Sequence, residues 1–149
     1  MVDKKVLLKF CTSFVNDRVS RIQENISGVQ ESLTSETKSS AGDKHETGRA
    51  MLQLEREKLG QQLLEAEKIR QTLSKVIIKN TTKTIGLGSL VFTAKNNYFL
   101  AISAGGFKSG NTNVYCISTD TPIGKLILGK SKGDNFVFND ENIAITEVV

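Results

Sequence analysis

The residues best suited to metal binding or nucleophilic chemistry are two cysteines and a single histidine. Cys11 and Cys116 lie in different halves of the chain, and they form no spacing typical of zinc ligands. His45 has no cysteine near it in the sequence. We therefore expect neither a zinc site nor a disulfide framework. Both thiols are expected to be ordinary buried side chains in a reducing compartment.

A second candidate for chemistry is the glycine-containing stretch SAGGFKSGN, residues 103–111, which could be mistaken for a phosphate-binding loop. A P-loop ends in Gly-Lys-Ser/Thr and leads into a helix, and this stretch does neither. It is therefore expected to be a mobile surface loop.

The third candidate is an acidic pair, Asp43 and Glu46. Asp followed three residues later by Glu is also a capping-box-like pattern at the start of a helix. From these residues alone, helix capping is the simpler interpretation. In the same way, Arg49 fits a solvated helix face that carries charges of both signs, and His45 fits an exposed loop.

The composition offers limited material for one large core. Of 149 residues, 38% are hydrophobic and 6% aromatic, with no tryptophan, which favours an elongated shape with a smaller globular part. The net charge of +4 is too small to favour direct binding to duplex DNA. No stretch is apolar enough to span a bilayer, and the start of the chain lacks the pattern of a signal peptide. We expect a cytoplasmic protein.

Apolar residues of the first half recur with heptad spacing, which predicts helices that pack along one side. The first row runs from Val15 to Leu33 in steps of 4, 3, 4, 3 and 4 residues. A looser second row runs from Leu52 to Leu73. The polar stretch between them, residues 35–48, has turn composition.

The two rows fit each other in one antiparallel register. This register pairs Leu33 with Leu52, Ile26 with Leu59, Ile22 with Leu63 and Val19 with Ala66. It places the turn at Gly42–Asp43, inside a tip near residues 38–48, and each arm would be roughly 40 Å long. We predict an antiparallel coiled-coil hairpin over residues 1–75.

After Lys75 the composition changes to Val, Ile, Thr, Phe and Gly, which indicates a small β-rich domain over residues 76–149. Strands are predicted at residues 90–93, 98–102, 113–118, 135–138 and 143–148. A short helix is predicted over Ile123–Leu128, because Pro122 suits a first helical turn and Gly129 suits a helix end. The predicted class is therefore α+β: an antiparallel α-helical hairpin followed by a β-rich domain with one short helix.

The segment Ile117–Asp134, ISTDTPIGKLILGKSKGD, resembles the signature of the C-terminal domain of the Gre family of bacterial transcript-cleavage and elongation factors. In that signature Ile-Ser, Ser/Thr-Pro, a small residue, a basic residue, a Leu-rich turn, Gly-Lys and Gly-Asp follow in this order. The resemblance implies an FKBP-like fold for residues 76–149. It also implies that Asp120, Thr121, Pro122 and Ile123 dock on RNA polymerase at the rim of its secondary channel.

The tip of the hairpin also resembles this family, whose coiled coil carries Gly-Asp, two residues and then Glu at its turn. Gly42 to Glu46 keeps this spacing. The resemblance implies that the hairpin enters the polymerase channel, where Asp43 and Glu46 help to hold a second Mg²⁺ that is shared with the polymerase. His45 and Arg49 would then lie near the 3′ end of the RNA. The polymerase, and not this chain alone, would cleave the backtracked RNA, so the free protein is expected to have no cofactor of its own. It is also expected to be a monomer.

The chain departs from the family directly after Glu46. The family usually continues with Asn-Ala-Glu-Tyr or close to it, whereas this chain has Thr47-Gly48-Arg49-Ala50 and so lacks one acidic and one aromatic residue. A second hypothesis therefore stays open, a Gre-like protein that occupies the channel and modulates or inhibits the polymerase without cleavage. Two further classes are a prolyl isomerase, for which the domain has few aromatic residues, and a coiled-coil assembly module.

Overall fold

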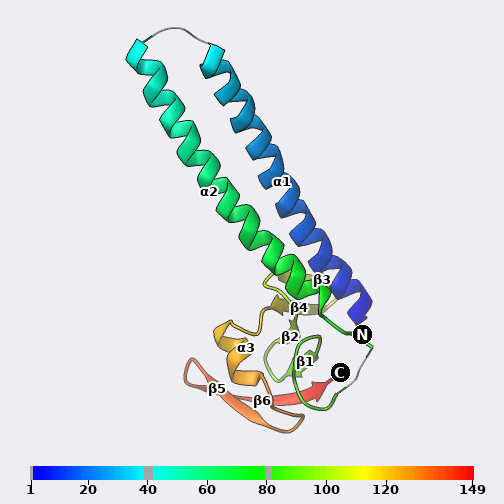
Figure 1. Ribbon diagram of the computed structural model, residues 1–149. Coiled ribbons are helices and arrows are strands. Elements are labelled where there is room, and N and C mark those ends of the chain that lie inside the picture. Colours follow the sequence, from blue (N-terminus) through cyan, green and yellow to red (C-terminus); the bar gives the residue numbers. More distant parts are fainter. Residues whose placement is uncertain (1, 39–41, 80–81) are drawn as a thin grey trace. The chain divides into compact units, whose positions relative to one another are not determined.

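The computed structural model describes residues 2–38, 42–79 and 82–149, and the side chains of residues 36–45 lie outside this description. The chain divides into two compact units (Figure 1). One unit is Val15–Arg70, which we call the helical arm. The other, which we call the sheet unit, combines Met1–Phe14 with Gln71–Val149. The sheet unit thus takes in the first residues of the chain as well as its second half.

Two long helices, α1 (Lys4–Lys38) and α2 (Gly42–Ser74), provide the helical arm. Figure 1 shows that they run in opposite directions, as the heptad pattern predicts. Both are polar on average, because polar and charged residues outnumber the apolar residues that the two helices bury between them. Within the described ranges, no helix carries an apolar stretch long enough to cross a membrane.

The two helices are held together by a narrow row of buried side chains, which we call the seam. Val19, Ile22 and Ala66 are buried in one cluster, and Ile26 and Leu63 pack against it. These residues come from both predicted apolar rows, at the levels that the antiparallel register assigns to them. The cluster agrees with the predicted antiparallel hairpin, and the individual pairs of the register stay predictions.

The prediction for the turn between the helices is wrong in its position. Gly42 and Asp43, expected at the centre of the turn, are the first two residues of α2. Residues 35–38 and 42–48, expected to be irregular because they are polar, are helical. Once the seam has fixed the first turns of a helix, each further residue adds a hydrogen bond at little cost, so a polar segment without proline continues the helix. Residues 39–41 lie outside the description.

Six strands form one sheet in the sheet unit, and the predicted α+β class is confirmed. The strands are β1 (Leu90–Thr93), β2 (Asn97–Leu100), β3 (Gly105–Ser109), β4 (Thr112–Ile117), β5 (Asn135–Phe138) and β6 (Glu141–Val148). Their order across the sheet is β3-β4-β2-β1-β6-β5, and neighbours are antiparallel except β2 and β4, which are parallel. The short helix α3 (Pro122–Ile127) follows β4, as predicted.

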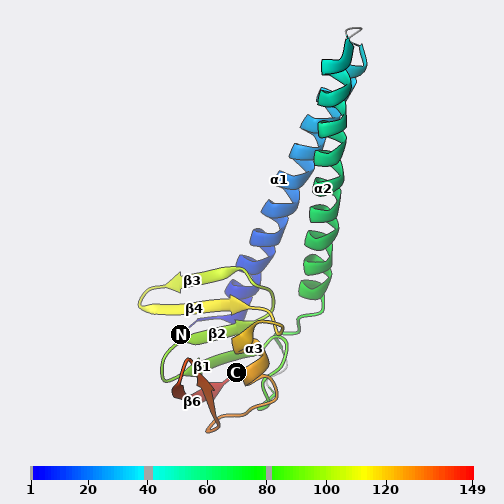
Figure 2. The same ribbon diagram turned by 90° about the vertical axis from the view of Figure 1, so that its left-hand side faces the viewer.

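The expected mobile loop at residues 103–111 is instead largely an edge strand. Gly105–Ser109 forms β3, which pairs with β4 along its whole length, and Figure 2 shows the two strands as a hairpin. The hairpin turns at Gly110, whose φ is +57°, a backbone conformation that favours glycine. The ring of Phe107 in β3 lies 5.3 Å from that of Phe10 in α1, centroid to centroid. Pairing and this aromatic contact outweigh the low strand propensity of the glycines.

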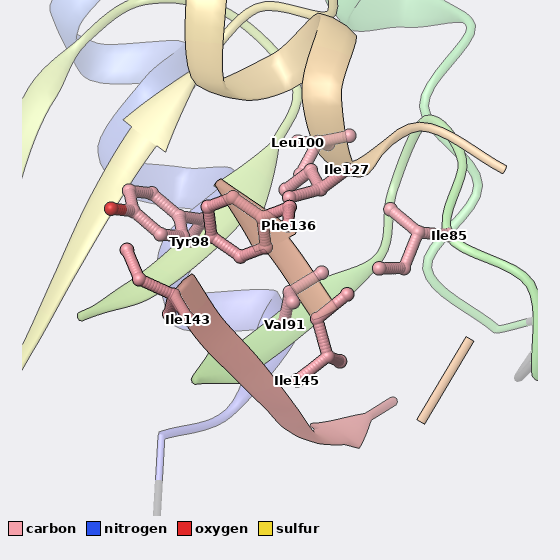
Figure 3. Close-up of a cluster of buried hydrophobic side chains, with 8 residues drawn as sticks. All are labelled: Ile85, Val91, Tyr98, Leu100, Ile127, Phe136, Ile143 and Ile145. Atoms are coloured by element: carbon pink, nitrogen blue, oxygen red, sulfur yellow. The ribbon is translucent and has the colours of Figure 1, made fainter. Parts of the chain in front are cut away.

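One hydrophobic core cluster of the sheet unit joins the strands to α3. Eight buried side chains form it: Ile85, Val91, Tyr98, Leu100, Ile127, Phe136, Ile143 and Ile145 (Figure 3). They come from β1, β2, β5, β6, α3 and the segment before β1. Ile127 is the contribution of α3 and is fully buried, so the short helix is fixed by this core.

Candidate functional site

The acidic residues predicted for the tip lie in the first turns of α2. Asp43 and His45 belong to the helix, but their side chains lie outside the described residues. Glu46 follows Asp43 by three residues, about one helical turn, and its side chain is exposed. Arg49 is exposed as well. The backbone thus places the predicted residues within two turns of each other at one end of α2.

The described side chains do not by themselves form a metal site. Among them, no group of three or more His, Cys, Asp or Glu residues could hold a metal ion. Mg²⁺ prefers oxygen ligands in a complete octahedral shell, often one or two carboxylates completed by water and phosphate. An acidic pair such as Asp43 and Glu46 has the right donor chemistry, but it can supply only part of that shell.

The predicted docking residues surround the start of α3. Thr121 is the N-cap: its hydroxyl accepts a hydrogen bond from the amide of Gly124 at 3.1 Å. The same hydroxyl donates to the carbonyl oxygen of Ser118 at 2.8 Å, which ties the cap to the end of β4. Pro122 takes the first helical position, where its missing N–H costs nothing. The prediction that Pro122 begins this helix is thus confirmed, and its role in docking stays a prediction.

Gly124 is required by the same turn. A Cβ atom built on it would lie 2.4 Å from the carbonyl oxygen of Ser118 and 2.8 Å from the hydroxyl oxygen of Thr121. Neither neighbour is the far end of a flexible side chain, so the turn cannot close around a larger residue. The small residue of the Ile117–Asp134 signature therefore has a steric reason in this fold.

The end of the signature is a second structural turn. Gly129 and Gly133 have φ angles of +83° and +91°, which favour glycine. The carboxylate of Asp134 accepts a hydrogen bond from the amide of Ser131 at 2.8 Å, and the Gly133 amide donates to the carbonyl oxygen of Ile145 at 2.9 Å. Gly129 thus follows directly on the end of α3, as predicted.

Several residues at and after the start of α3 face solvent. Asp120, Pro122 and Lys125 are exposed, and Leu126 and Leu128 leave 37% and 48% of their surface exposed. We call these five residues the α3 surface. Ile123 differs from them because it packs against the core cluster. Its side chain is therefore committed in part to holding α3 on the sheet.

The two cysteines are neighbours in the sheet unit, which their separation in the sequence does not indicate. Both are buried, as predicted, and both are free thiols in this structure. A hydrogen bond from the Cys116 thiol lowers the pKa of Cys11, which also receives a hydrogen bond from the backbone of Ile102. Donating that bond, together with burial, raises the pKa of Cys116. No sequence signal indicates this contact, since it depends on α1 packing beside β4.

Comparison with known proteins gives matches in structure alone. The sequence matches no protein-family model and no curated protein. Among solved structures, the chain is similar to GreA factor homolog 1 (Gfh1) of Thermus thermophilus, with 18% identity, a TM-score of 0.37 and coverage of 91% of this chain and 92% of that one. It is also similar to a second structure of the transcription factor Gfh1, with 20% identity, a TM-score of 0.36 and 90% coverage of each chain. At TM-scores this low the likeness carries no inference about function, which rests on the residues of this chain.

Proposed function

We propose that this chain is a Gre-type transcription factor that binds bacterial RNA polymerase at its secondary channel and stimulates cleavage of backtracked RNA. The observation that carries the proposal is the segment Ile117–Asp134. It resembles the Gre signature in sequence, and its Thr, Pro, Gly and Asp positions are the ones that build the turns around α3. In this role the protein is not an enzyme by itself, and it acts in the cytoplasm, where the polymerase is.

In this proposal the helical arm enters the secondary channel and carries the carboxylates. Glu46 is exposed near the start of α2, one turn after Asp43. These two residues would contribute ligands to a Mg²⁺ ion, and the polymerase would contribute the rest. The ion, when bound, provides the second centre of a two-metal hydrolysis site, which stabilises charge on the attacking and leaving oxygens. His45 and Arg49 would lie beside the RNA.

The α3 surface supplies the docking contact. It presents exposed Pro122, Leu126 and Leu128 together with the charged residues Asp120 and Lys125. Apolar and charged side chains on one surface are usual in a protein–protein contact. Because Thr121 and Gly124 hold the turn in one conformation, the surface is already shaped before the partner arrives.

One observation favours a second candidate function, a polymerase modulator without cleavage. Thr47-Gly48-Arg49-Ala50 follows Glu46, and in the described structure these residues continue α2 with Arg49 exposed. A cation at this place adds positive charge where the family has a carboxylate. It would weaken an adjacent Mg²⁺ site while leaving the α3 surface intact.

The test is transcript cleavage by a stalled, backtracked RNA polymerase from the same organism, with Mg²⁺ present. We expect shortened RNA that resumes elongation. The double variant Asp43→Ala, Glu46→Ala should lose this stimulation and keep its affinity for the polymerase. The matched control, Glu55→Ala with Glu57→Ala, removes two exposed carboxylates from the same helix and should cleave normally. Stimulation that survives in the tip variant would reject the role of the carboxylates.

Docking is tested separately by measuring the affinity for the polymerase. Leu126→Glu places a charge in the α3 surface and should weaken binding. Lys108→Glu introduces the same residue on the exposed edge strand β3 and should bind like the unmodified protein. Binding without RNA shortening would support the modulator. Equal binding by the two variants would remove the α3 surface from the proposal.

A further inference from the structure

Lys4, the first residue of α1, is buried although it carries a charge. It leaves 8% of its surface exposed, in a unit where most lysines face solvent. Lysine is almost never buried this deeply unless it has a partner, because removing an ammonium group from water is costly. The surroundings of Lys4 therefore need an explanation.

Lys4 has no partner among the described residues. No hydrogen bond or ion pair reaches its side chain there, and the pKa of Lys4 is lowered by burial as the single cause. The neighbouring carboxylate of Asp3 accepts a hydrogen bond from the backbone amide of Lys5 at 3.0 Å and forms no ion pair with Lys4. Lys4 is the first residue of a long helix, so it stands at the positive end of the helix dipole, where a further positive charge is disfavoured.

Lys4 is one of the residues that line a pocket of about 250 Å³. Apolar residues form most of its wall: Val2, Ile78, Leu90, Phe92 and Val149. Leu90 and Val149 exchange two backbone hydrogen bonds, of 3.0 and 2.8 Å, so this part of the wall is fixed by the sheet. The polar part of the wall is Asp3, Lys4 and Lys5.

We propose that this pocket binds a small amphipathic anion, with its carboxylate or phosphate head on Lys4 and a short alkyl body against Ile78, Leu90 and Phe92. The head group would supply the missing counter-charge, and a charge-assisted hydrogen bond in a partly buried site is stronger than one in water. The alkyl body would cover apolar side chains of the pocket that water otherwise contacts. This site lies in the sheet unit and does not depend on the proposed role in transcription.

The test titrates three probes of equal chain length, namely hexanoate, hexyl phosphate and hexanol, and follows the backbone amide signals of Leu90 and Phe92 by NMR. Saturable binding of hexanoate or hexyl phosphate, with hexanol weaker by about tenfold or more, is expected. The ratio of the two anions identifies the head group. Equal binding of hexanol, or no saturable binding by either anion, would overturn the proposal.

Two variants assign the binding to Lys4. Lys4→Met keeps the length of the stem and removes the charge, so the anions should bind about tenfold or more weakly. Lys9→Met removes an exposed lysine of the same helix, outside the pocket, and should change nothing. In the unmodified protein, saturation with hexanoate should also raise the pKa of Lys4, read from the NMR signal of its methylated amine. An unchanged Lys4 pKa at saturation would contradict the assignment even if Lys4→Met folds poorly.

Discussion

In the helical arm a small cluster of buried side chains lies along the seam between the two helices, whereas in the sheet unit a larger cluster is built from strands and α3. The seam cluster has three buried residues with two packed beside it, and the sheet cluster has eight with four beside it. Large apolar side chains of α2 also stay exposed, among them Met51 at 67% and Leu54 at 66%.

From this difference we expect the two units to lose different amounts of stability when a buried residue is substituted. A seam loses little when one residue is removed, because water is close on both sides and the helices can approach each other. A closed cluster has no such freedom, so each of its side chains and turns is held to one shape. The sheet unit is therefore the more sensitive scaffold, and the arm is the part that accommodates new residues.

The largest effect is expected in the centre of the sheet. Phe99 in β2 is fully buried between β1 and β4, and Phe99→Ala should lower the free energy of unfolding by about 3–5 kcal/mol. Ile22→Ala in the seam should cost less, about 2 kcal/mol. Urea unfolding followed by tyrosine fluorescence reports on the sheet unit, which contains both tyrosines, and helical circular dichroism reports on the arm. Equal losses of unfolding free energy for the two variants would contradict the expectation that the sheet unit is the more sensitive of the two.

The same substitution should have opposite signs in the two units. Gly124→Ala meets the carbonyl oxygen of Ser118 at 2.4 Å and should destabilise the protein by about 1–3 kcal/mol. Gly28→Ala in α1 meets nothing within 4 Å and should stabilise it by about 1 kcal/mol, because alanine is the better helix former. Thermal unfolding of both variants measures this. If Gly28→Ala destabilises the protein, the arm does not tolerate substitutions better than the sheet unit at this position.

A smaller loss is expected when the cap of α3 is removed. Thr121→Ala deletes the hydroxyl that accepts from the Gly124 amide, and it should cost about 1 kcal/mol of unfolding free energy. Thr121→Ser keeps the hydroxyl and serves as the control, with most of the stability retained. If serine and alanine destabilise the protein equally, the methyl group of Thr121 matters and the cap does not.

The smallest effect concerns an exposed ion pair of the sheet unit. The Lys132 ammonium lies 3.2 Å from the Glu147 carboxylate and is the main cause that holds the pKa of Glu147 below its ordinary value of 4.5. The pair stabilises the fold above that ordinary value and loses its effect as the pH falls through the lowered pKa. Lys132→Met should move the Glu147 pKa upward in an NMR titration, whereas Lys125→Met should not. Because the pair is exposed, no measurable change in unfolding free energy is expected.

The sequence by itself determined the elements whose signals are local. Heptad spacing from Val15 to Leu33 predicted α1 and its antiparallel packing on α2, because side-chain direction in a helix repeats every few residues. Pro122 and Gly129 predicted both ends of α3 to within one residue, since each restricts the backbone at one position. Asp43 and Glu46 remain predictions as site residues, because their role depends on a partner and not on the fold of this chain.

Only the tertiary structure decided features that join distant parts of the sequence. The glycines of β3 indicate a loop until the pairing with β4 is known. The contact of Cys11 with Cys116 and the burial of Lys4 exist because the first turns of α1 belong to the sheet unit. No residue type or spacing encodes these contacts, since they follow from the pairing order of the strands and from which face α1 covers, and both are set by the packing of the whole unit.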